Sequence, residues 1–367
     1  MKKLILIALL TLTLTGCWNQ KIIDELGFIL QVGIESGENE DIEITINSPL
    51  VRPNKETIAH VQSTTETSTR IAREHFSQKT PDIFVNGKIQ QLLFSEELAQ
   101  KGIVVYLDSF QKDPIFPLIA YIVVVDGSPK ELITNMTNSE MISLPSLYMN
   151  DLIEGNVSSS STVESKLFSF IRDYYAEGVD PITPLVKMTN GDIQIMGSAL
   201  FLNDQMVGKI DPRQTSLLLA ALNQAKPTEY EFHTLNPMKE TSNKNLCVTA
   251  SLIPKKAKIN ITMVHAEPEV DIFLNFRSWI TGYPFGSIDD PKIQDELKEG
   301  MAREIEKDFM EMISIVQNSG SDPLGIGSKV HGKYNEYWNS IDWLEVYPEI
   351  SINVHVNLEI SDAGRLR

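Results

Sequence analysis

Cysteine, histidine and positive charge are scarce in this sequence of 367 residues, which has two cysteines, six histidines and a formal net charge of −17. Proteins bind nucleic acids mainly through cations that neutralise phosphates, so this acidic chain argues against a nucleic-acid partner. It argues equally against adsorption to anionic lipids. No two histidines have the i, i+4 spacing of helical zinc ligands, and no Gly-x-Ser-x-Gly nucleophile motif occurs. We therefore expect a protein that is not an enzyme and has no catalytic residue, metal or cofactor.

One run comes close to a phosphate-binding loop. Residues 327–334 contain its glycines and lysine, but Tyr334 stands where a Ser or Thr must reach the magnesium ion. The run also follows a predicted helix instead of a strand, so we interpret it as a turn with several glycines. The paired carboxylates Glu96-Glu97 and Asp289-Asp290 stand where helices are expected to begin, so they predict helix caps or dipole partners.

The first residues have the pattern of a signal peptide. Lys2 and Lys3 precede an apolar run over residues 4–14, which is too short to span a membrane. The run ends at Leu14-Thr15-Gly16-Cys17, which resembles the lipobox of bacterial lipoproteins. We therefore predict cleavage after residue 16 and lipidation of Cys17, with a diacylglycerol thioether on sulfur and an acyl group on the amine. Two or three acyl chains would hold the protein stably on a membrane.

Lipidation of Cys17 has two consequences for the mature chain. Cys247 is then the remaining thiol, so no internal disulfide is possible and the core must be large enough to fold unaided. Loss of Lys2 and Lys3 with the signal peptide also makes the net charge about −19. Contact with the membrane must then come from the anchor and from protein partners.

Apolar runs and turn residues predict strands and short helices in the first half of the chain. Residues 57–76 are Thr-rich, with apolar residues spaced as in an amphipathic helix. Ser95 is expected to cap a helix that Gly102 ends, and Ser161 with Glu164 forms a capping box before a core-facing helix. Strands are predicted at 29–34, 42–50, 89–94 and 119–125, and a helix is predicted from Ser128-Pro129.

The second half shows stronger periodicity. Residues 291–317 place apolar side chains on one helical face, with Asp290 as the expected cap. Residues 350–360 alternate strictly between apolar and polar, which predicts a strand with His355 on its solvent face. Strands at 193–202 and 205–210 should form a hairpin, and a helix should follow from Asp211-Pro212.

The pattern as a whole indicates an α+β fold, in which mixed sheets are packed by helices and a long helix lies on an antiparallel sheet at the C-terminus. The length suggests two or three domains. Beyond the signal peptide (1–16), we predict an N-terminal α/β domain (17–190) and a C-terminal domain (191–367). A further division of the second near residue 240, into a small hairpin-helix domain and a larger helix-sheet domain, stays open.

Aromatic residues gather between the long helix and the last strand, at Tyr334, Tyr337, Trp338, Trp343 and Tyr347. They are either core packing or a contact surface, because Trp and Tyr serve both purposes. Trp338 is expected in the core. Trp343 is the predicted partner contact, because Asp342 and Glu345 flank it with charge.

Several segments, in order, resemble the Ger(x)C spore germination lipoproteins. The opening Cys17-Trp18-Asn19 is similar to the family's Cys-Trp-Asp, with Asn in place of Asp. In the family's other opening motifs, this chain has Ile22 where the family has Glu and Glu35 where the family has Asp. The further matches are Ile23–Gly27, Gly33–Glu35, Ser95–Ile103, Gly197–Phe201, Val207–Ile210, Asp322–Gly327, Trp338, Trp343 and the closing strand to Gly364.

The resemblance implies a mixed α/β protein of about three small domains. It implies a C subunit of a GerA-type nutrient germinant receptor, working beside two integral membrane subunits, A and B. The lipid anchor would place it on the outer face of the spore inner membrane, and the nutrient would contact it at most indirectly. Only Cys17 carries a chemical role over from the family pattern.

Two other functions are weighed against this one. A solute-binding lipoprotein of a transporter needs two doubly wound lobes, whereas the hairpin, helix and terminal strand here favour an α+β layout. A lipid-anchored envelope enzyme is disfavoured by the missing motifs.

Overall fold

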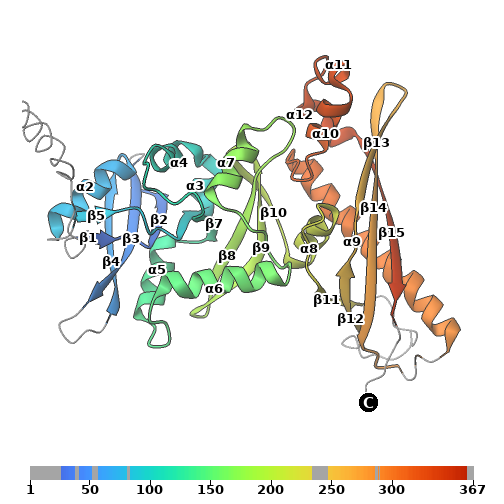
Figure 1. Cartoon of the computed structure of the whole chain (residues 1–367), viewed down its shortest axis with the longest axis horizontal. Coiled ribbons are helices and arrows are strands. Elements are labelled where there is room, and N and C mark those ends of the chain that lie inside the picture. Colours follow the sequence, from blue (N-terminus) through green and yellow to red (C-terminus); the bar gives the residue numbers. More distant parts are fainter. Residues whose placement is uncertain are drawn as a thin grey trace, which may run out of the picture.

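The computed structural model describes residues 26–37, 41–51, 57–80, 83–233, 247–285, 288 and 290–361. Figure 1 shows two lobes side by side along the long axis, an N-terminal lobe built on one large sheet and a C-terminal lobe built on a second sheet and a long helix. The predicted α+β class with mixed sheets is confirmed. Cys17 and the predicted signal peptide lie outside the described residues. Among the described residues, no helix is both long and apolar enough to cross a membrane.

The sheet of the N-terminal lobe has eight strands in the order β10-β9-β8-β7-β6-β2-β3-β4. Its centre is parallel, because β2, β6, β7 and β8 run in one direction, and antiparallel hairpins extend it at both edges. The strands are β2 (Gln31–Ser36), β3 (Ile42–Val51), β4 (Thr57–Glu66), β6 (Gln91–Ser95), β7 (Tyr121–Asp126), β8 (Ile182–Thr189), β9 (Asp192–Leu202) and β10 (Gln205–Ile210). A separate parallel pair joins β1 (Leu26–Phe28) to β5 (Ile83–Val85).

Helices cover both faces of this sheet, which explains why its central strands are continuously apolar. On β6, Leu92 and Phe94 face one core and Leu93 faces the other. The first core includes side chains of α2 (Thr69–Lys79), α3 (Glu96–Lys101), α4 (Val104–Gln111) and α7 (Leu167–Tyr175). The second includes side chains of α5 (Pro129–Asn138) and α6 (Pro145–Ser158).

The C-terminal lobe contains α8 (Pro212–Ala221) and a five-stranded sheet. Its strands are β11 (Thr228–Phe232), β12 (Val248–Pro254), β13 (Lys258–Val264), β14 (Glu267–Gly282) and β15 (Ser351–Ile360). The helix α9 (Pro291–Ser319) lies along this sheet in Figure 1 and buries a row of apolar side chains that includes Met301, Ile305 and Phe309. Three short helices and a 3-10 turn follow: α10 (Ile326–Lys333), α11 (Asn335–Trp338), α12 (Trp343–Val346) and η2 (Tyr347–Glu349).

The last strand corrects one detail of the predicted C-terminal sheet. β15 pairs parallel with β14, whereas the other pairs of this sheet are antiparallel. The reason is topological, because the long crossover through α9 returns the chain in the same direction, as in a βαβ unit. His355 lies on the solvent face as expected, where its ring stacks on Phe273 and bonds Asp271.

Four predicted helix caps, each formed by the residue directly before its helix, are confirmed. The side chains of Ser95, Ser128, Asp211 and Asp290 each accept a backbone N–H of the first helical turn. At Asp211 the capping box is complete, because Gln214 returns a bond to the Asp211 N–H.

Three local predictions are wrong. Residues 57–66 form β4, at the sheet edge, because Thr and Val suit a pleated surface and the hairpin partner β3 pairs along the whole strand. α7 begins at Leu167 with Ser169 bonding the backbone of Lys166, so Ser161 and Glu164 are not its capping box. The glycine-containing run at 327–334 is mostly the helix α10 instead of a turn.

The large sheet continues past residue 190. Asn190 and Gly191 form the turn between β8 and β9, which are neighbouring strands of one sheet. The division between residues 17–190 and 191–367 therefore crosses that sheet, which ends at Ile210. The change from one sheet to the other falls at α8, between β10 and β11.

Candidate functional sites

A cleft of about 940 Å³ opens on the N-terminal lobe between α2, β5 and the segment from α4 to Ile115. Its apolar walls come largely from the first core of the large sheet, and its polar residues come from the two helices, from Asn86 after β5 and from the segment after α4. Apolar walls with a few polar groups are the usual lining of a site for a small organic ligand. The apolar lining includes Ile29, Val32, Ile44, Ile46, Phe76, Phe84 and Phe110.

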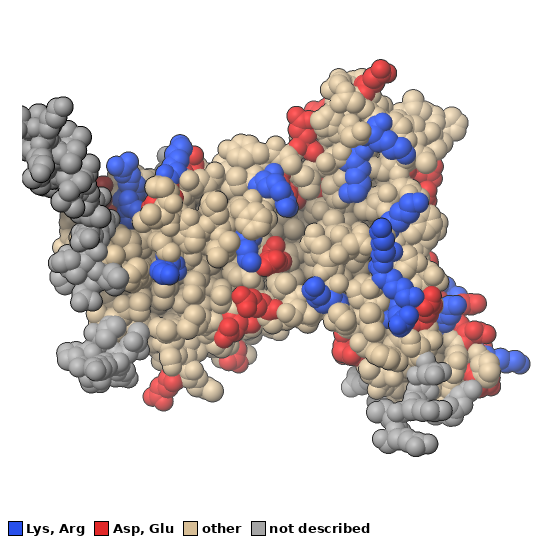
Figure 2. All heavy atoms as spheres, in the orientation of Figure 1, with Lys and Arg blue, Asp and Glu red and all other residues tan. Residues whose placement is uncertain are grey.

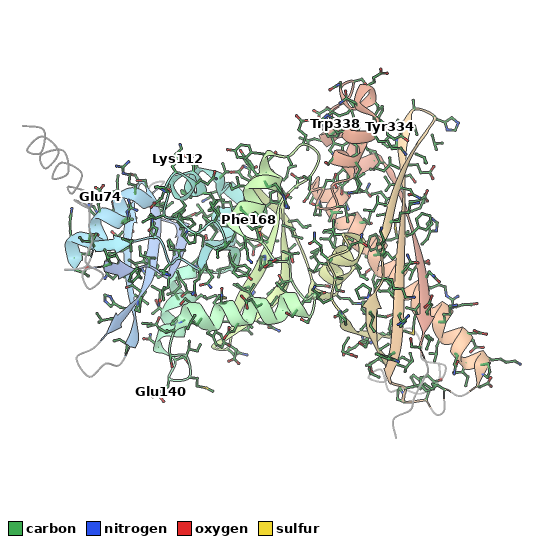
Figure 3. The ribbon with its side chains drawn as sticks, in the orientation of Figure 1. Glu74, Lys112, Glu140, Phe168, Tyr334 and Trp338 are labelled. Carbon is green, nitrogen blue, oxygen red and sulfur yellow. The ribbon has the colours of Figure 1, made fainter. Side chains whose placement is uncertain are left out.

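The polar residues of the cleft bond to one another. Arg73 of α2 pairs with Asp113 at 3.1 Å, and the Asn86 side-chain amide donates to the same carboxylate at 3.0 Å. Figure 3 shows Glu74 on α2 and Lys112 after α4, on this side of the lobe, and in Figure 2 basic and acidic side chains stand close together there. No histidine or cysteine is among the described residues that line the cleft. Its charged lining residues include Glu74, Asp108, Lys112 and Asp113, and its size and apolar walls suit a small organic ligand.

The second site is the junction between the lobes, where residues 178–180 meet residues 322–328. The two segments exchange backbone bonds: Asp180 N–H donates to the Asp322 carbonyl at 3.1 Å, and Ser328 N–H donates to the Gly178 carbonyl at 2.7 Å. The Asp180 carboxylate accepts the Asp322 N–H at 2.9 Å and the Asn203 N–H at 2.9 Å. One side chain thus holds both lobes.

Glycine is required on both sides of this junction. Gly178 has φ +71, and a Cβ there would lie 2.3 Å from the Gly327 carbonyl carbon. A Cβ on Gly327 would in turn lie 2.8 Å from the Gly178 Cα and 2.5 Å from Nε1 of Trp343. Because these neighbours are mostly backbone, they cannot rotate away as a flexible side chain would. The lobes therefore touch backbone to backbone.

Asp322 is a buried carboxyl group at the centre of the junction. Its oxygens accept the N–H groups of Ile326 and Gly327 at 3.0 and 2.7 Å, which caps α10. Burial, with a smaller contribution from the nearby Asp180, raises its pKa to about 7, although the two N–H bonds and Lys329 act in the opposite direction. Burial also raises the pKa of Asp180 and lowers the pKa of Lys329, whose ammonium donates to the carbonyls of Leu324 and Gly325.

The predicted aromatic group forms a row that leads from the surface into this junction. The ring of His331 stacks on Trp338 at 5.1 Å, Trp338 lies 5.5 Å from Trp343, and Trp343 lies 5.6 Å from Tyr347. Tyr347 is buried, and both tryptophans are half-buried against the core of the C-terminal lobe. Tyr334 and Trp338 are labelled in Figure 3, at the end of the lobe that carries α10 and α11.

Trp343 has an inward edge and an outward one. Its Nε1 atom is buried against Gly327 and has no hydrogen-bond partner among the described residues. The next residue, Leu344, is 50% exposed. Trp338 and Trp343 are thus both half-buried, whereas the sequence predicted one in the core and the other in a partner contact. The role of Trp343 as a partner contact stays a prediction.

Sequence reasoning did not single out Gly178, Asp180 or Asp322 as a site. The one available signal was the Asp-Pro-Leu-Gly-Ile-Gly run at 322–327, whose acid and glycines stand close together. Lys333, the lysine of the near-match to a phosphate-binding loop, donates to the Ile261 carbonyl at 2.7 Å, and Lys329 of the same run donates to carbonyl groups of the junction.

Comparison with known proteins gives matches along nearly the whole chain. Residues 19–188 match the family described as spore germination protein N-terminal domain, and residues 196–364 match spore germination B3/GerAC-like, C-terminal. The chain is 21% identical to spore germination protein GerQC of Bacillus cereus over 366 residues, which covers 99% of each protein.

Other relatives cover similar shares. The chain is 18% identical to spore germination protein B3 of Bacillus subtilis (strain 168), over 96% of this chain and 95% of that protein. A crystal structure of the GerBC protein superposes with a TM-score of 0.56 and 16% identity, covering 90% of this chain and 97% of that one. This likeness shows that the fold is shared.

Proposed function

Because the chain belongs to the GerAC family of spore germination proteins, with matches from residue 19 to residue 364, we propose that it is the lipid-anchored C subunit of a nutrient germinant receptor. The resemblance to the Ger(x)C proteins is confirmed by these matches, and family membership supports a role in spore germination. The family match is the single observation that carries the proposal. Lipid anchoring, the receptor complex and the nutrient trigger are the parts that we add.

The anchor is proposed from the sequence around Cys17. Eight residues separate Cys17 from Leu26, where β1 begins, and a chain of this length reaches at most about 30 Å. The N-terminal lobe would therefore stay close to the membrane that holds the lipid. In the proposed arrangement this membrane is the spore inner membrane, with the protein on its outer face.

The partners are proposed to be the two integral membrane subunits of the same receptor. The subunit itself would be non-enzymatic, which agrees with the paired polar groups of the cleft and the structural use of the junction carboxylates. It would hold the membrane subunits or pass on a conformational change. The half-exposed Trp343 and the exposed Leu344 are the proposed contact with a partner. Any nutrient contact would be indirect.

The alternative of a solute-binding lipoprotein is less well supported by this architecture. Such a protein binds its ligand between two doubly wound lobes. Here the C-terminal sheet is mostly antiparallel, and the lobes meet in direct backbone contact at Gly178 and Gly327.

The anchor is tested by mass spectrometry and fractionation of spores that carry Cys17→Ala. We expect a diacylglycerol-modified Cys17 in the parent, and loss of both the modification and membrane association in the variant. Cys247→Ala is the matched control, because it removes the other thiol and should leave anchoring unchanged. An unmodified Cys17 in the membrane-bound parent would contradict the proposal.

A further inference from the structure

Three side chains with metal-binding chemistry meet beside the first two strands of the C-terminal sheet. Glu231 lies in β11, His233 follows that strand, and Cys247 directly precedes β12. Their ligand atoms, one from each side chain, all lie within 4.8 Å of one another. These residues are far from the cleft in the sequence and have no part in the function proposed above.

Strand register explains why the three side chains share one place. β11 and β12 are antiparallel with Phe232 opposite Val248, so the next pair outward is His233 opposite Cys247. Alternate residues of a strand point to the same face, which puts Glu231 beside His233. The opposite face carries Phe232, which is fully buried. The cluster therefore follows from the backbone and not from one choice of rotamers.

The strand β11, which carries Glu231 and leads directly into His233, is held firmly. The Tyr230 hydroxyl donates to Asp308 at 2.7 Å, and the guanidinium of Arg213 lies 4.1 Å from the centre of the Tyr230 ring. The His233 N–H donates to Glu304 Oε1 at 3.0 Å. Anchoring of this kind keeps ligands in place before an ion arrives, which is what a specific metal site requires.

We propose that Glu231, His233 and Cys247 bind a divalent ion of the zinc class. Thiolate, imidazole and carboxylate are the zinc ligands of proteins, whereas calcium and magnesium prefer oxygen alone. Ligand atoms around one zinc ion stand roughly 3.3–3.7 Å apart, so small side-chain rotations complete the site. Glu231 and His233 are exposed and Cys247 is half-buried, so an ion has access.

Three protein ligands leave one coordination position for water or for a side chain of a partner. The ion would cross-link the ends of β11 and β12 and would stabilise the folded chain, because the unfolded chain lacks the assembled site. Binding would also release the thiol proton of Cys247, so it should weaken at low pH. In the structure the cluster contains a 3.7 Å contact of Glu231 with His233, beside the free thiol of Cys247.

The test is a Co²⁺ titration of the purified full-length chain after treatment with a chelator. We expect one ion per chain, a thiolate-to-cobalt absorption band, displacement of Co²⁺ by Zn²⁺, and a higher thermal unfolding midpoint with Zn²⁺. Cys247→Ser should abolish the band, and His233→Asn should weaken binding at least about tenfold. Unfolding of each metal-free variant, compared with the metal-free parent, shows that it still folds.

Two matched controls make the result specific. Cys17→Ser removes the other cysteine, and His265→Asn changes a histidine in the β13–β14 turn. Both variants should leave the cobalt band unchanged. A band that survives Cys247→Ser and vanishes with Cys17→Ser would overturn the proposal. Absence of a thiolate band in the parent, or binding that His233→Asn does not weaken, would overturn it as well.

Discussion

Replacement of Gly178 by alanine should loosen the junction between the lobes. The new Cβ would lie 2.3 Å from the Gly327 carbonyl carbon and 2.4 Å from the Ser328 nitrogen, so the two segments must separate by about 1 Å to reach ordinary contact. That movement lengthens the 2.7 Å bond from Ser328 N–H to the Gly178 carbonyl beyond hydrogen-bonding range.

The size of the effect follows from three contributions. A left-handed backbone costs alanine roughly 1–2 kcal/mol, overpacking against backbone costs about 1–3 kcal/mol, and the lost hydrogen bond about 1 kcal/mol. Gly178→Ala should therefore lower the free energy of unfolding by about 3–6 kcal/mol. For a chain of this size the thermal midpoint should fall by roughly 6 °C or more.

Two other glycines provide matched controls for the assay, which is thermal unfolding together with amide hydrogen exchange at Ser328. Gly191 also has positive φ, at +90, but has open space around it, so Gly191→Ala should show the conformational cost alone. Gly332 lies in α10 with open space, so Gly332→Ala should be neutral or slightly stabilising. Equal effects of Gly178→Ala and Gly191→Ala, with unchanged exchange at Ser328, would refute the steric account.

Three further predictions concern the junction, the aromatic row and the absence of catalysis. The pKa of Asp322 is about 7 in the folded chain, well above its ordinary value. Between about pH 4 and 7, the carboxyl group is therefore protonated in the folded chain and ionised in the unfolded chain. The free energy of unfolding should fall as pH rises through this range, by at most about 4 kcal/mol from this group. Asp322→Asn should make the thermal midpoint depend less on pH. An unchanged pH dependence in this variant would contradict the prediction. Trp343→Ala should lower the thermal midpoint, because it empties the space over Gly327. Leu344→Ser should leave the midpoint unchanged but weaken recovery with the membrane partners about tenfold or more. A Leu344→Ser chain that assembles normally would remove this surface from the proposed contact. Finally, the purified chain should turn over no nucleotides, esters, peptides or muropeptides, and an activity that one point change abolishes would disprove the non-enzymatic assignment.

Local signals in the sequence predicted much of the fold. The caps at Ser128, Asp211 and Asp290 depend on a side chain and a backbone N–H within three residues, so a short stretch of sequence contains the whole interaction. The strict alternation of residues 350–360 predicted β15 for the same reason. Its parallel direction could not be predicted, because it depends on how the chain returns after α9.

The junction between the lobes was beyond sequence reasoning. Asp180 and Asp322 are 142 residues apart, and neither segment shows that its backbone will bond to the other. A glycine such as Gly178 commonly serves to close a helix, and nothing in the sequence around it shows that Gly327 will approach it. β4 was missed because Thr-rich edge strands have weak alternation and gain their stability from the partner strand.

The most direct test of the proposed function is co-purification from spore membranes. The parent chain, carrying an affinity tag and solubilised in mild detergent, should recover two integral membrane proteins of one receptor in a constant ratio, and spores without this chain should fail to germinate with the matching nutrient. Cys17→Ala should abolish the recovery and Cys247→Ala should preserve it. A parent chain that is lipidated and abundant in the membrane, but recovers no integral membrane protein and is not needed for germination, would contradict the account.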